Sequence, residues 1–111
     1  MTWNHYHTQN FKEAEKFINE AGPSSLAGIQ CAMSNGKDIH LFVEHQTPGT
    51  QYQVWHLLWK GNAKDEILHR LNNHQVALIG FDYKEKGQQE PNSIFYVVDE
   101  SGASEAIGER V

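Results

Sequence analysis

The chain has 111 residues, a length that predicts a single domain. Nine Lys and Arg against fourteen Asp and Glu give a formal net charge of −5, which disfavours nucleic-acid binding through phosphate neutralisation. Hydrophobic residues make up 39% and charged residues 21%, close to ordinary soluble proteins, so the composition excludes wholesale disorder.

Targeting and redox signals are sparse. The first residues have no basic region followed by an apolar one, and no apolar run reaches the roughly 20 residues of a membrane-spanning helix. Cys31 is the single cysteine, which excludes an internal disulfide. The sequence therefore predicts a cytoplasmic protein with no membrane partner.

Two segments have helical signals. In Asn10–Ala21 the apolar residues recur at helical spacing, Asn10 is suited to cap the first turn, and Gly22 with Pro23 ends the helix. A shorter helix is expected over Asn62–Asn73, with Asn62 as its cap. Each predicted helix has one apolar stripe, so each is expected to pack one side against a sheet.

Strand signals occupy most of the remaining chain. They fall at Leu26–Met33, Asp38–His45, Tyr52–Trp59, Gln75–Tyr83 and Ser93–Asp99, with Thr2–His7 as a candidate for an additional N-terminal strand. The predicted fold is one α+β domain over residues 1–111, in the order α-β-β-β-α-β-β, with a mainly antiparallel sheet of about five strands. Residues 101–111 have weak periodicity and are expected to form a loosely packed tail.

The turns between the first three predicted strands suggest their pairing. Asn35-Gly36 is typical of a two-residue hairpin turn, which places Cys31 opposite His40. A second turn at Pro48-Gly49 would place Phe42 opposite Trp55, making a three-stranded meander.

Strand alternation divides this meander into two faces. One is aliphatic and is expected to lie under the two helices. The other is aromatic, and its exposed apolar area predicts that a terminal segment, a second subunit or a ligand covers it. The candidate binding residues on this face are Phe42, Trp55, Leu57, Trp59, His40 and Glu44.

Sequence motifs for catalysis, metal binding and phosphate binding are weak. The seven His residues have no spacing typical of a metal site, and the glycines have no phosphate-binding pattern. Cys31 beside His40 suggests a nucleophile and base, although a lone Cys in a strand is more typical of a small buried apolar residue. We therefore predict no catalytic residue, metal or cofactor.

The sequence favours a small soluble accessory protein that acts by binding a protein partner or a second copy of itself. An inhibitor or immunity role is one form of this hypothesis, in which the acidic surface attracts a basic toxin or enzyme. The alternative is a dimeric α+β protein that binds or converts a small molecule in an aromatic pocket on the sheet face.

Overall fold

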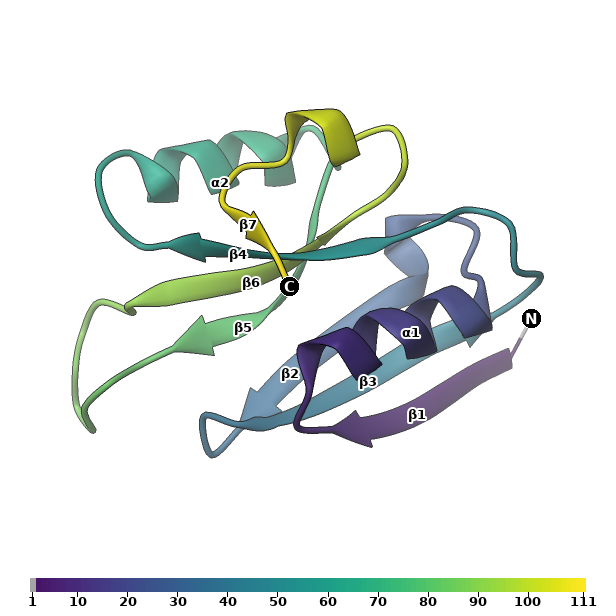
Figure 1. Cartoon of the computed structure of the whole chain (residues 1–111), viewed down its shortest axis with the longest axis horizontal. Helices are drawn as coiled ribbons and strands as arrows, with labels where there is room; N and C mark the ends of the chain where they lie inside the picture. The colour runs from purple at the N-terminus through teal and green to yellow at the C-terminus, as the bar shows by residue number, and fades with distance from the viewer. Residues whose placement is uncertain (1) are drawn as a thin grey trace.

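The computed structural model describes residues 2–111 and confirms the predicted single α+β domain with antiparallel strands (Figure 1). The strands form two sheets, of three and four strands, where one sheet of about five was expected. Its elements, in chain order, are β1 (Thr2–Thr8), α1 (Phe11–Ala21), η1 (Leu26–Gly28), β2 (Ile29–Ser34), β3 (Asp38–His45), β4 (Gln53–Leu58), α2 (Ala63–Asn72), β5 (Ala77–Asp82), β6 (Ser93–Val98), η2 (Ala103–Glu105) and β7 (Glu109–Arg110). The candidate strand at the N-terminus is confirmed as β1.

Helix α1 forms where its capping residues predict it. The Asn10 side chain accepts a hydrogen bond of 3.0 Å from the Glu13 backbone N–H, which satisfies one of the free donors of the first turn. Gly22 ends the helix with φ of 64°, in the left-handed region that favours glycine. A Cβ at Gly22 would also lie 2.6 Å from the Pro48 nitrogen, so this position requires glycine on both counts.

Helix α1 packs against both sheets. Sheet A has the strand order β1-β3-β2, and sheet B has the order β5-β6-β4-β7. The helix contacts β1, β3 and β4, and its buried residues share a core with both sheets. The first core contains Ala14, Ile18, Ala21, Ile29, Ile39, Leu41, Val43, Tyr52, Val54, Ile79 and Val97.

Sheet B has a second core on its opposite face. Helix α2 and the C-terminal segment cover that face, so sheet B is buried on both sides (Figure 1). The buried residues of this second core are Ile67, Val76, Ile94, Tyr96 and Val98. The expectation that both helices share one face is wrong, because α1 and α2 lie on opposite faces of sheet B.

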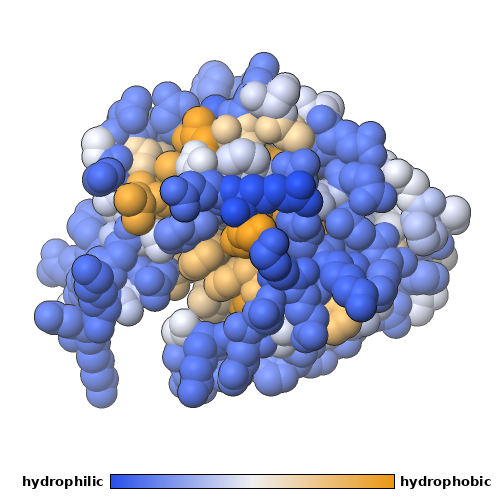
Figure 2. All heavy atoms as spheres, in the orientation of Figure 1, coloured by the Kyte–Doolittle hydropathy of each residue, from blue (hydrophilic) through white to orange (hydrophobic). Residues whose placement is uncertain are grey.

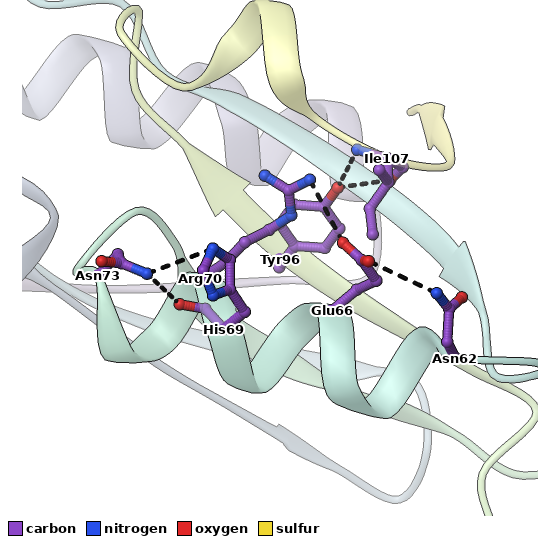
Figure 3. A network of polar contacts seen from close by, with 7 residues as sticks. All are labelled: Asn62, Glu66, His69, Arg70, Asn73, Tyr96 and Ile107. Carbon is purple, nitrogen blue, oxygen red and sulfur yellow. Dashed lines mark hydrogen bonds and ion pairs between the residues drawn. The ribbon is translucent and has the colours of Figure 1, made fainter.

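The C-terminal segment is fixed to sheet B by specific contacts, which differs from the expectation of a loosely packed tail. The Tyr96 hydroxyl donates to the Ile107 carbonyl and accepts from the Ile107 N–H at 2.9 Å (Figure 3). Burial raises the pKa of Tyr96, so its hydroxyl keeps the proton that it donates. Val111 then donates from its backbone to the Val54 carbonyl at 3.1 Å.

The predicted pairing of β2 with β3 is wrong by one residue. Asn35 and Gly36 have positive φ, as expected for this turn, but Lys37 is an additional residue outside the ladder. Ser34 therefore pairs with Asp38, and Cys31 lies opposite Leu41 instead of His40. Since side chains alternate along a strand, this one-residue shift moves Cys31 to the opposite face from His40.

The predicted pairing of β3 with β4 is also wrong. β3 lies between β1 and β2 in sheet A, whereas β4 lies between β6 and β7 in sheet B. The connecting segment follows the end of α1: Gln46 donates to the Ala21 carbonyl at 3.0 Å, and Asn19 bonds both backbone groups of Tyr52 at 2.7 and 3.1 Å. These bonds lead the chain across to the second sheet and prevent a tight hairpin.

The two sheets meet at a seam between β2 and β5. A Cβ at Gly80 would lie 2.6 Å from the Met33 sulfur, so glycine allows the two strands to approach closely. A bulge in β5 between Leu78 and Gly80 accompanies this approach. Figure 2 shows a hollow with apolar atoms at its floor, and Met33, Gly80 and Phe81 help line a cavity of about 320 Å³ at the seam.

Candidate functional site

The exposed face of sheet A, on the side away from α1, is the candidate site. β1 contributes Trp3, His5 and His7 to this face, and β3 contributes residues directly opposite them. The register pairs Trp3 with Glu44, His5 with Phe42 and His7 with His40. We call these six residues, together with Asp38, the outer face.

Two aromatic side chains of the outer face are exposed to solvent. Trp3 is 48% exposed and Phe42 is 49% exposed. The His5 ring lies beside Phe42 with a centroid distance of 4.9 Å. The side chains on the other side of β3 are fully buried under α1, so the first core holds the strand that carries Phe42 in place.

The three imidazole rings of the outer face form a stacked row. His40 stacks between His5 and His7, with centroid distances of 5.3 and 4.8 Å. His5 Nε2 and His40 Nδ1 share a hydrogen bond of 3.0 Å. The row is therefore ordered by both stacking and hydrogen bonding, and it fixes the side chains around Phe42.

The carboxylate of Asp38 closes one end of this row. It accepts hydrogen bonds of 2.9 Å from the Gln9 amide and from His7 Nε2. These bonds, first that of Gln9 and then that of His7, lower the pKa of Asp38 below its ordinary value. Asp38 is thus a fixed negative charge at the edge of the outer face.

The predicted site residues divide between two places. His40, Phe42 and Glu44 share the outer face, as expected from strand alternation. Trp55, Leu57 and Trp59 pack instead against the second core, under α2 and the C-terminal segment. The prediction of one continuous aromatic face is therefore wrong, because β3 and β4 belong to different sheets.

The tryptophans of sheet B have internal partners. Trp59 Nε1 donates to Glu90 at 2.7 Å, and its ring meets Phe81 edge-on at 5.6 Å. Trp55 Nε1 donates to Gln53 at 3.0 Å. Both indoles thus satisfy their N–H groups within the fold, as partly buried Trp usually does. That any of the six predicted residues binds a partner stays a prediction.

Sequence reasoning did not include Trp3, His5 and His7 among the site residues. Their alternation with Asn4, Tyr6 and Thr8 carried the signal, since it places the two imidazoles and the indole on one side of an N-terminal strand. The sequence carries no signal that this strand pairs with β3, so the position of these residues beside Phe42 and His40 could not be predicted from it.

Cys31 lies on the inner face of sheet A, away from the row of imidazoles. Burial raises the pKa of its thiol to about 12, so the thiolate that a nucleophile needs is absent at neutral pH. The proposed pair with His40 is wrong, because His40 lies opposite Ala32. Cys31 serves as a small apolar residue beside the first core.

Among residues 2–111, no group of three or more His, Cys, Asp or Glu side chains is arranged to hold a metal ion. Over the same residues, neither helix has both the length and the apolar character needed to span a bilayer.

No protein-family model, no curated protein and no solved structure matches this chain. The interpretation of its function therefore depends on the outer face itself.

Proposed function

We propose that this protein acts without catalysis, by binding a protein partner through the outer face of sheet A. The observation that carries the proposal is the pair of half-exposed aromatic residues, Trp3 and Phe42, on a sheet face that no element covers within residues 2–111. Tryptophan and other aromatic residues supply much of the binding energy in protein interfaces.

The charge of the outer face suggests a partner with a basic surface. Glu44 lies opposite Trp3 at one end, and the ionised Asp38 lies at the other end. The chain as a whole has a net charge of −5, which accelerates encounter with a positively charged protein. An inhibitor or immunity role, in which this face blocks a basic toxin or enzyme, fits this charge.

Affinity capture with two matched pairs of variants tests the proposal. Trp3→Ala and Phe42→Ala alter the outer face, whereas Leu68→Ala and Tyr83→Ala alter residues of equal exposure elsewhere, 48% and 46%. We expect the captured partner to bind the outer-face variants about tenfold more weakly or worse. The control variants should bind it as tightly as the unmodified protein.

Two outcomes would contradict the proposal. One is a partner that binds the Trp3 and Phe42 variants with unchanged affinity. The other is a partner whose association rate does not fall as ionic strength rises, because exposed charges that guide encounter are screened by salt.

A cavity in sheet B supports a second candidate function, the binding of a small apolar ligand. It has a volume of about 470 Å³ and lies between the end of β4 and the segment that leads into β7. The surface of this cavity is mainly apolar, and Lys60 and Glu109 are its charged lining residues. The full lining consists of His56, Leu57, Leu58, Lys60, Gly108 and Glu109. This volume is in the range of small-molecule sites.

Nuclear magnetic resonance with a panel of apolar fragments tests this second function. Binding in the cavity would shift the amide signals of Leu57, Leu58 and Gly108 in a saturable way. Shifts confined to the outer face, or none at all, would reject the cavity as the site.

A further inference from the structure

The free edge of sheet A carries a second, independent inference. Within residues 2–111, the only ladder partner of β1 is β3, and Figure 1 shows no element on the other side of β1. An edge strand presents a row of main-chain N–H and C=O groups that can pair with another strand. β1 pairs with β3 through all seven of its residues without a bulge, so this edge is long and regular.

The outer edge of sheet B, along β4, is partly covered. β7 pairs with Trp55 and His56 of β4 and so occupies part of that edge. The next residue, Val54, donates its N–H to the Glu15 carboxylate at 2.8 Å and accepts at its carbonyl from Val111 at 3.1 Å. The fold thus covers one outer edge with a short strand and a side chain, and leaves the other uncovered.

The residues of β1 do not protect its edge. Natural edge strands are commonly guarded by Lys, Pro or a bulge. The sequence Thr-Trp-Asn-His-Tyr-His-Thr of β1 contains no Pro and no formally charged side chain at neutral pH. In a chain with a net charge of −5, β1 is therefore a segment where two copies can meet without opposing like charges.

We propose that β1 pairs antiparallel with β1 of a second copy of this chain, which forms a dimer with one continuous sheet. The register that pairs all seven residues places His5 opposite His5 of the second copy and Trp3 opposite its His7. This register gives each half-exposed Trp3 a second cross-strand neighbour, in addition to Glu44 of its own chain.

The dimer also joins the outer faces of the two copies into one surface. Trp3, His5 and His7 would then lie at its centre, with the β3 residues of each copy on both sides. The dimer does not depend on the proposed protein partner, because it can be measured with the purified chain alone.

A charge exchange at the centre of the interface tests the dimer. We expect the unmodified protein to have twice the mass of one chain in light scattering over a concentration series. His5→Glu and His5→Lys alone should each give the mass of one chain, because like charges then face each other across the axis. An equimolar mixture of the two variants should restore the doubled mass.

The control is His69→Glu, which makes the same substitution at an exposed position on α2. It should keep the mass of the unmodified protein. The proposal is overturned if the unmodified protein has the mass of one chain throughout, or if the two His5 variants keep the doubled mass.

Hydrogen exchange provides a second measurement that needs no variant. In a dimer, the amides of residues 2–8 that point away from β3 become more protected as protein concentration rises through the range in which the mass doubles, whereas those of β6 do not change. Exchange of these β1 amides that stays the same through the concentration range in which the mass doubles would also overturn the proposal.

Discussion

The two sheets of this protein each have an aromatic surface on the side away from α1, but only one is covered. In sheet B, Trp55 and Trp59 lie under α2 and the C-terminal segment. In sheet A, Trp3 and Phe42 remain about half exposed. Aromatic content alone therefore does not identify a binding surface, because the same residue types form a core wherever the chain returns to cover them.

The two sheets differ in coverage because most segments after β4 pack on sheet B. After β4, most of the remaining residues build and cover sheet B, including α2, η2 and β7. Within residues 2–111, α1 is the helix that covers sheet A, on its inner face. The proposed binding function depends on this exposed aromatic face of sheet A.

The largest expected effect comes from removing an indole from the covered surface. Trp55→Ala leaves a cavity in the second core and should lower the free energy of unfolding by about 3 kcal/mol. Trp3→Ala should lower it by about 1 kcal/mol or less, because half of that side chain is already in water. Urea denaturation of both variants measures the difference, and equal losses would show that the two surfaces are not distinct.

A smaller effect is expected where the covering segment is attached. Tyr96→Phe removes the hydroxyl that bonds both backbone groups of Ile107 (Figure 3) and should cost about 1–3 kcal/mol. The amides of residues 107–111 should also exchange faster, since the segment loses its attachment. If their exchange is unchanged, β7 and the apolar contacts hold the segment without Tyr96.

The smallest expected effect concerns the charge on the outer face. The pKa of Asp38 is lowered in the folded protein, so its carboxylate favours folding above the unfolded-state pKa. That contribution is lost as the pH falls through the folded-state value. Asp38→Asn should therefore reduce stability near neutral pH and converge with the unmodified protein in acid, as measured by urea denaturation over a pH series. A constant difference across the series would show that Asp38 acts through its shape and not its charge.

Local patterns in the sequence predicted the elements well. The cap at Asn10 and the stop at Gly22 marked α1, and the strand Asp38–His45 was predicted with the bounds that the structure shows. These features depend on residues close together in the chain. The α+β class followed from them directly.

Pairing between strands was less predictable, because it depends on contacts that the sequence does not display. One unpaired residue, Lys37, shifted the β2–β3 register. Pro48-Gly49 resembled a hairpin turn, but hydrogen bonds between Asn19 and Tyr52 hold the chain beside α1 just before β4, and β4 joins the other sheet. As a result, the three candidate residues of β4 and its end, Trp55, Leu57 and Trp59, pack against the second core. The three of β3, His40, Phe42 and Glu44, lie on the outer face.

The seam between β2 and β5 has a mechanical consequence. Within residues 2–111, these strands lie side by side but belong to separate ladders, so packing such as that of Met33 on Gly80 joins them without a shared ladder of main-chain bonds. Where β2 and β5 meet, the distance between the two sheets is therefore set by how closely Met33 can approach position 80, so any side chain larger than hydrogen there would push the strands apart without breaking a ladder bond.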